Sequence, residues 1–285
     1  MKLPTLKIFI FIAIILAISC VEEYSPDKII QEVGNTFVPD SREGVFSITA
    51  TKVGGKKLLL KGETDNEKAL DALITRLQDS LYSVVDSVLV LPDNVLSPWG
   101  MVTLSVANLR SSASHDAEMI TQALMGTPLK ILKETSDWAF VQTPDGYLAW
   151  CEKDAYAGLQ HLEMAQWQNS ERVVVVSLFA IVSDLKSNKP VSDVVAGCIL
   201  QQTSLKGTEV LVRLPDGRVG KIQQKDVLNF EAWRRSDGIK AENLIRTAEN
   251  ILGIPYLWGG DFCKGGRLQW VYKNGLFFKL VYSFA

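Results

Sequence analysis

Apolar and polar residues alternate over two adjacent segments in the first third of the chain. They read V-F-S-I-T-A-T-K-V from Val45 and K-K-L-L-L-K-G from Lys56, with the pair Gly54-Gly55 between them. A period of two residues on both sides of a glycine turn is typical of a β-hairpin. The pattern therefore predicts a hairpin at the start of the first folded module.

Helical periodicity follows this hairpin. The polar stretch Thr64 to Asn66 offers candidate N-caps, and apolar residues then recur at three- and four-residue spacing up to position 81. The later run S-V-L-V-L-P-D predicts a further strand. Together these patterns predict a small α+β module over residues 45–93. It carries no cluster of catalytic residue types, so we expect a spacer or docking role.

A repeated turn organises the middle of the chain. T-P-D-G-Y-L-A-W at 143–150 aligns with L-P-D-G-R-V-G-K at 214–221, and each follows several short strand patterns. Pro-Asp-Gly is a turn signal, and short strands at this spacing are typical of small barrels. We therefore expect two β-barrels, over residues 98–160 and 170–232.

The N-terminus has the features of an export signal. Lys2 and Lys7 precede an apolar run over 8–18, which is too short to span a bilayer. Small residues then lead into Cys20, and this junction resembles a bacterial lipobox, with Ala17 where leucine is usual. The resemblance implies a lipoprotein signal over residues 1–20, lipidation of Cys20 and attachment to a membrane without crossing it. An ordinary signal peptide with an incidental cysteine is the alternative. Residues 21–44 are polar with a weak helical pattern, and they predict a tether.

Charge and cysteine usage narrow the range of partners. The net charge of −2 gives no reason to expect nucleic acid. Apart from Cys20, the cysteines are Cys151, Cys198 and Cys263, which are dispersed and lack any Cys/His ligand spacing. This argues against a disulfide framework and against zinc, although a single bridge stays open. We expect no metal and no cofactor.

The first predicted barrel resembles the bacterial SH3-like (SH3b) domain. Residues 106–154 contain N-L-R-S, an A-E pair, G-T-P-L, a tryptophan-bearing strand and D-G-Y-x-x-W. The second unit resembles the same fold more weakly, because it lacks N-L-R-S and has Lys221 where the first has Trp150. Such domains in exported bacterial proteins attach to or measure cell-wall peptide. We interpret Trp138 as a core aromatic.

The last segment resembles the opening of a peptidase domain. Residues 241–252 have helical periodicity and end at Gly253, and P-Y-L-W-G-G follows at 255–260. Behind two SH3b units, this arrangement is similar to the NlpC/p60 family of papain-like cysteine peptidases, of the dipeptidyl-peptidase VI type. The resemblance covers about residues 98–264. It implies a murein-peptide hydrolase that cuts γ-D-Glu–diamino acid bonds, with residues 238–265 as the start of its α+β catalytic domain.

The sequence then departs from that family. The family continues with K-G-x-D-C-S-G-F, whose cysteine is the nucleophile and is activated by a helix N-terminus and a later histidine. Here the chain reads C-K-G-G-R-L-Q-W-V. In a frame displaced by one nucleotide, the second base of each codon becomes a first base. For G-R-L-Q-W-V these bases match the first bases of codons for V-D-C-S-G-F.

We therefore expect residues 266–285 to be an out-of-frame tail of an interrupted peptidase domain, and the chain to be inactive as written. Both histidines, His115 and His161, precede the expected nucleophile. Cys263 is a weak substitute, because nothing in the sequence supplies it with a helix N-terminus or an imidazole partner. No residue is therefore assigned a catalytic role.

Four residues could still bind substrate. The resemblance implies that Glu118 of D-A-E-M and Tyr147 of D-G-Y hold the free amine of an N-terminal L-Ala, and charge-assisted hydrogen bonding suits that role. Tyr256 and Trp258 would line the same site. The alternatives are a solvated surface for Glu118, a barrel rim for Tyr147 and core packing for Trp258.

Two functions follow from these expectations. The first is an exported, lipid-anchored murein-peptide cysteine peptidase, disrupted in this form. The second is a non-catalytic cell-wall-binding SH3b lipoprotein. In both cases the partners are murein peptides and a membrane surface, and the fold is multidomain: an α+β module, two SH3b-like barrels and the first helix of an incomplete papain-like domain.

Overall fold

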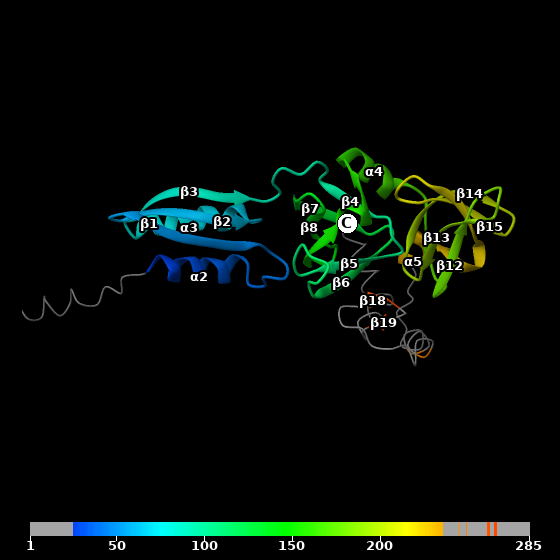
Figure 1. Cartoon of the computed structure of the whole chain (residues 1–285), viewed down its shortest axis with the longest axis horizontal. Helices are drawn as coiled ribbons and strands as arrows, with labels where there is room; N and C mark the ends of the chain where they lie inside the picture. Colours follow the sequence, from blue (N-terminus) through cyan, green and yellow to red (C-terminus); the bar gives the residue numbers. More distant parts are fainter. Residues whose placement is uncertain (1–24, 236–244, 246–248, 250–260, 263–264, 267–285) are drawn as a thin grey trace, which may run out of the picture. The chain divides into compact units, whose positions relative to one another are not determined.

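The computed structural model describes residues 25–235, Ile245, Glu249, 261–262 and 265–266 (Figure 1). The predicted signal peptide with Cys20, and the predicted site residues Tyr256 and Trp258, lie outside these residues, as does Cys263. The described part of the chain is mostly β, with one three-stranded sheet, two seven-stranded sheets and one two-stranded sheet. Among the described residues, no helix is long and apolar enough to span a membrane.

The chain divides into two compact units. The N-terminal unit comprises residues 1–41 and 45–89, and the C-terminal unit comprises 42–44 and 90–285. The N-terminal unit contains a sheet of order β1-β2-β3 and two helices. Its elements are α2 (Pro26–Phe37), β1 (Phe46–Gly54), β2 (Lys57–Thr64), α3 (Glu67–Asp79) and β3 (Ser83–Val90).

The hairpin β1–β2 and the helix α3 lie where the periodicity places them. Leu58 and Leu60 are paired with Lys52 and Ala50, which lie four and two residues from Ile48 on β1. Ile48, Leu58 and Leu60 therefore lie on the same face of the hairpin, and all three are buried. The side chain of Asn66 caps α3 by accepting a hydrogen bond of 3.1 Å from the backbone N–H of Ala69.

Helix α2 is a difference from the sequence expectation, which reads residues 21–44 as a tether. Ile29 and Val33 lie one turn apart on α2, and both are 1% exposed. The carboxylate of Glu32 accepts a hydrogen bond from Arg76 of α3. The helix forms because its narrow apolar stripe is buried against other elements of the N-terminal unit. A tether would leave these apolar side chains in water.

The first seven-stranded sheet, called the first sheet below, occupies the segment of the first predicted barrel. Its strand order is β10-β4-β7-β8-β9-β5-β6, and its core includes Leu109, Ile131, Val141 and Cys151. The elements are β4 (Trp99–Val102), β5 (Val106–Arg110), β6 (Met119–Leu124), β7 (Pro128–Glu134), β8 (Trp138–Gln142), β9 (Leu148–Glu152), the 3₁₀ turn η1 (Lys153–Ala155) and β10 (Tyr156–Leu159).

The second seven-stranded sheet, called the second sheet, follows helix α4 (His161–Asn169). Its order is β13-β12-β16-β15-β14-β11-β17, and helix α5 follows its last strand. The elements are β11 (Arg172–Val175), β12 (Phe179–Ser183), β13 (Pro190–Val195), β14 (Ile199–Lys206), β15 (Glu209–Arg213), β16 (Val219–Gln223), the 3₁₀ turn η2 (Gln224–Asp226), β17 (Val227–Asn229) and α5 (Phe230–Arg235).

The two seven-stranded sheets are joined by packing and by hydrogen bonds. Leu124 and Met125 of the first segment belong to the hydrophobic core of the second sheet. The backbone N–H of Ile199 donates to the carbonyl of Met125 over 2.9 Å, and Ser105 Oγ donates to Asp193 over 2.7 Å. The junction therefore has a shared apolar core and defined backbone contacts.

The remaining described residues lie in the last predicted segment. Asp261–Phe262 (β18) and Gly265–Gly266 (β19) form a two-stranded ladder. Of the helix predicted over 241–252, only Ile245 and Glu249 are described, and both are helical and exposed. The rest of that helix and the P-Y-L-W-G-G motif fall outside the described residues.

Candidate functional site

Glu118 and Tyr147 lie on the two sides of the C-terminal end of β5. Arg110, the last residue of β5, is in register with Met119 of β6 on one side and with Trp150 of β9 on the other. Glu118 immediately precedes β6, and Tyr147 immediately precedes β9. The fold therefore brings these two residues, far apart in sequence, to the same end of neighbouring strands.

A tight turn positions Tyr147. The backbone N–H of Thr143 donates to the carbonyl of Tyr147 over 2.9 Å, and the N–H of Gly146 donates to the carbonyl of Thr143 over 2.9 Å. Gly146 has a φ of +89°, which glycine adopts without steric cost. The side chain of Tyr147 is half-buried. The Pro-Asp-Gly turn therefore fixes the backbone from which the Tyr147 ring projects.

A second set of hydrogen bonds holds Glu118. The N–H of Ser111 donates to the carbonyl of Glu118 over 2.9 Å, and the Arg110 guanidinium donates to the carbonyl of Ala117 over 2.8 Å. The side chain of Glu118 is exposed. These bonds tie the backbone of Glu118 to β5.

An aromatic pair lies on the strands beside this end of β5. Phe140 and Trp150 are in register on β8 and β9, with ring centroids 5.2 Å apart. The ammonium of Lys133 lies 5.3 Å and 5.5 Å from the two centroids. Trp138 is instead buried at 7% exposure, which confirms its interpretation as a core residue.

The described histidines do not face a described thiol. His115 Nδ1 lies 3.5 Å from the Glu152 carboxylate, and its ring packs 5.2 Å from that of Trp138. His161 begins α4 and is exposed. In the part of the chain that the structure describes, no group of three or more histidine, cysteine or acidic side chains could hold a metal ion.

Cys151 and Cys198 are free thiols in separate cores. Burial raises the pKa of each to about 12. A thiol with that pKa is about one part in ten thousand thiolate at pH 8, and the thiolate is the reactive form.

We therefore expect iodoacetamide at pH 8 to label neither Cys151 nor Cys198 in the native protein. Denaturant should make both reactive, because an unfolded cysteine has a pKa of about 8.5. Peptide mapping by mass spectrometry after labelling, with and without denaturant, measures both states. Native labelling of the peptide that contains Cys151 would contradict the buried, protonated thiol.

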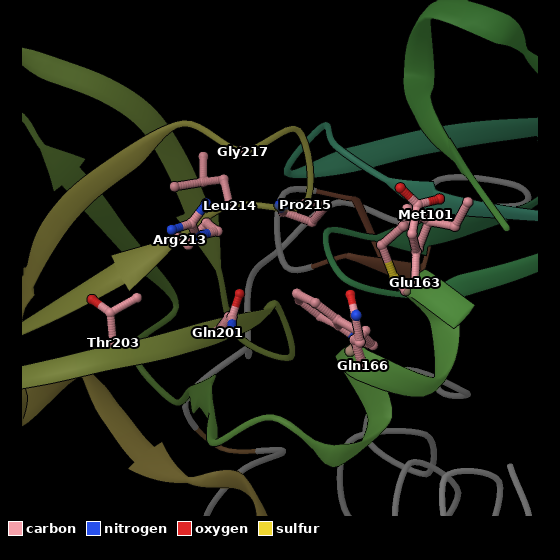
Figure 2. A pocket seen from close by; sticks show the side chains of 11 residues that line it. Met101, Glu163, Gln166, Gln201, Thr203, Arg213, Leu214, Pro215 and Gly217 are labelled. Carbon is pink, nitrogen blue, oxygen red and sulfur yellow. The ribbon is translucent and has the colours of Figure 1, made fainter. Parts of the chain in front are cut away.

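A cavity lies between the two seven-stranded sheets (Figure 2). It has a volume of about 390 Å³ and is lined by Met101 of β4 and Leu159 of β10 in the first sheet, by α4, by β14 and β15, and by the turn after β15. Glu163 and Arg213 lie on opposite sides of it (Figure 2). Sequence reasoning did not find this cavity, because its walls come from segments that only the packing of the two sheets brings together.

Comparison with known proteins agrees with the resemblance drawn from the motifs. Residues 109–155 match the family model of the bacterial dipeptidyl-peptidase Sh3 domain. Dipeptidyl-peptidase 6 of Lysinibacillus sphaericus is 23% identical over 56% of this chain and 62% of the relative. The gamma-D-glutamyl-L-lysine dipeptidyl-peptidase of Bacillus cereus (strain ATCC 10987 / NRS 248) is 28% identical over 54% of this chain and 50% of the relative.

Solved structures show the same fold. An NlpC/P60 family protein from Bacillus cereus ATCC 10987 superposes with a TM-score of 0.52 at 19% identity, over 62% of this chain and 72% of that one. An NlpC/P60 endopeptidase from Photobacterium damselae subsp. piscicida superposes with a TM-score of 0.50 at 18% identity, over 67% and 45%. The resemblance to SH3b-containing NlpC/p60 proteins is confirmed, and the chain spans 50% to 62% of the length of the two curated relatives.

Proposed function

We propose that this chain derives from an exported cell-wall peptide hydrolase that cuts γ-D-Glu–diamino acid bonds in murein peptides with a free N-terminal L-Ala. The matched SH3 domain and the names of the two curated relatives support this class of substrate. The similarity to NlpC/P60 structures supports the fold that such an enzyme needs.

The placement of Glu118 and Tyr147 carries the proposal. Both residues precede strands that flank the end of β5, so a carboxylate and a phenol are presented from the same end of the first sheet. An ammonium group is recognised by charge-assisted hydrogen bonds to a carboxylate, and a neutral oxygen can accept a further hydrogen bond. A free peptide amine fits that pair, whereas an acylated amine has lost the charge that Glu118 would bind.

We further propose that the catalytic cysteine is encoded in the displaced frame, so that the chain as written does not turn over substrate. R-L-Q-W-V stands where the family has D-C-S-G-F, and the second base of each of these codons matches the first base of the corresponding family codon. The DNA sequence around the codon for Lys264 tests this. A gene with no displaced frame that encodes D-C-S-G-F and a later histidine would contradict it.

The binding half of the proposal is tested with the tripeptide L-Ala-γ-D-Glu-L-Lys and its N-acetyl form. Calorimetric titration of the full chain should give about tenfold weaker binding after acetylation, because a charged hydrogen bond is lost. Glu118→Gln should remove the difference between the two peptides. Glu67→Gln, an exposed glutamate in the N-terminal unit, is the matched control and should preserve it.

The same preparation tests the proposed inactivity. Incubation with the tripeptide, followed by chromatography of the products, should show no cleavage. Binding without cleavage is also what a non-catalytic cell-wall-binding protein would give. A gene in which no displaced frame encodes D-C-S-G-F and a later histidine would then favour that alternative. Cleavage by the chain as written would overturn the proposed inactivity, and equal binding of both tripeptides would overturn the role of Glu118.

A further inference from the structure

The cavity between the two seven-stranded sheets carries an inference that does not depend on the proposed function. Neither Glu118 nor Tyr147 lines it. Its volume of about 390 Å³ falls near the lower end of the range for small-molecule sites, which is about 300–1,000 Å³. The cavity is therefore suited to a small ligand and not to a folded partner.

Arg213 forms a positive wall of the cavity. Arg213 is the last residue of β15 and is in register with Gln201 on β14. The two side chains therefore project from the same face of the sheet. The backbone of Arg213 is paired with Gln201 and Val219, and among the described residues its guanidinium has no hydrogen bond or ion pair. Arg218, in the turn that follows, is instead bound to Asp216 over 2.6 Å and to the carbonyl of Val191 over 2.7 Å. Arg213 is thus the guanidinium available to an anion.

The opposite wall carries a negative charge and an aromatic ring. Glu163 lies in the first turn of α4, and its carboxylate accepts a 2.7 Å hydrogen bond from the N–H of Gln160, which holds it in place. Trp167 follows four residues later on the same helix face and is half-buried. Gln166 adds an amide beside it. Figure 2 places Glu163 and Gln166 across the cavity from Arg213.

This arrangement selects for a ligand with two charges. A ligand carboxylate can take two parallel hydrogen bonds from the fork of Arg213, and the amides of Gln201 and Gln166 can bond peptide groups. An ammonium group suits Glu163, while a flat apolar segment packs against the Trp167 ring. A neutral ligand, or one with a single charge, would engage at most one of the two charged side chains, which are both exposed.

We propose that this cavity binds a short zwitterionic peptide, with its C-terminal carboxylate at Arg213 and its N-terminal ammonium at Glu163. In a protein that acts on murein peptides, such a site would retain a released peptide beside the SH3 domain. The recognition rests on charge and size, so it extends to short peptides that contain no γ-D-Glu bond.

The probe is L-Ala-L-Ala, compared with its C-terminal amide and its N-acetyl form. Calorimetric titration of the full chain should give binding that each modification weakens about tenfold, since each removes one charged hydrogen bond. In Arg213→Gln the free acid should bind no better than the amide. In Glu163→Gln the free amine should bind no better than the acetyl form. Lys225→Gln removes one positive charge from an exposed site on η2 and should leave all three affinities unchanged.

A second measurement locates the ligand and guards against misfolded variants. In ¹⁵N-labelled wild-type protein, dialanine should shift the side-chain NH₂ signals of Gln166 and Gln201 and leave the backbone signal of Tyr147 unchanged. Failure of dialanine to bind, equal binding of the acid and the amide, or shifts confined to the region of Glu118 and Tyr147 would overturn the proposal. Because dialanine is not a murein peptide, absence of tripeptide recognition at Glu118 leaves this result intact.

Discussion

Replacing Gly126 by alanine is expected to lower the free energy of unfolding of the C-terminal unit by about 3 kcal/mol or more. Gly126 has a φ of +83°, in the left-handed region. A Cβ atom there would lie 2.3 Å from the carbonyl oxygen of Ile199 and 2.9 Å from its Cβ. The obstacle is mainly backbone, so it cannot rotate away, and the strand that begins at Ile199 would have to move.

The effect should extend beyond local strain, because Gly126 lies at the junction of the two seven-stranded sheets. Its N–H donates to the carbonyl of Val102 over 2.9 Å, while the neighbouring carbonyl of Met125 accepts from the N–H of Ile199 over 2.9 Å. A displacement that relieves the clash therefore lengthens the bond between the sheets and loosens the packing of Met125 in the second core.

Gly207→Ala is the matched control for this prediction. Gly207 has a φ of +61°, and a Cβ atom there would meet nothing within 4 Å. Gly207→Ala should lower the free energy of unfolding by about 1 kcal/mol, which is the cost of the left-handed backbone alone. Urea unfolding followed by circular dichroism measures both variants. Equal losses for Gly126→Ala and Gly207→Ala would show that the clash with Ile199 contributes nothing.

Replacing Phe230 by alanine is expected to cost about 3–5 kcal/mol of unfolding free energy. The Phe230 side chain is 1% exposed and lies in a core with Val174 and Ile199. The guanidinium of Arg172 stands 4.6 Å from its ring centroid, and the Trp233 ring lies 6.1 Å away. Truncation leaves a cavity where α5 meets the second sheet and removes the aromatic face that Arg172 covers.

Phe179→Ala provides the control, because it makes the same chemical change at an exposed position, on β12 of the second sheet. The Phe179 side chain is 49% exposed, so its truncation should cost less than about 1 kcal/mol. Chemical denaturation of both variants, followed by tryptophan fluorescence, gives the two values. A loss below 1 kcal/mol for Phe230→Ala would mean that α5 is not anchored to the second sheet by this ring.

The two candidate sites differ in whether motifs predicted their residues. The D-A-E-M and D-G-Y motifs singled out Glu118 and Tyr147, and strand register places both beside the end of β5. Arg213 and Glu163 carry no motif. They stand apart in sequence, on β15 and α4, and only the packing of the two sheets gives them a common cavity.

Helix α2 could not be predicted from the pattern of its own polar segment. Ile29 and Val33 have helical spacing, but a two-residue apolar stripe in a polar stretch is as compatible with a tether as with a helix. The surface that buries them is supplied by other elements of the N-terminal unit, including α3, which begins only at Glu67. A short helix of this kind is stabilised by its partner, and its own residues do not carry that information.

By itself the sequence determined the hairpin, the capped helix α3, the two Pro-Asp-Gly turns and the resemblance to murein peptidases, because each depends on residues that are neighbours along the chain. Only the tertiary structure decided that Met125, Gly126 and Ile199 join the two sheets, and that Arg213 faces Glu163 across a cavity. Those outcomes depend on contacts between segments that are distant in sequence. Burial and the space around the backbone select one arrangement there, and the periodicity of a single segment does not reveal either of them.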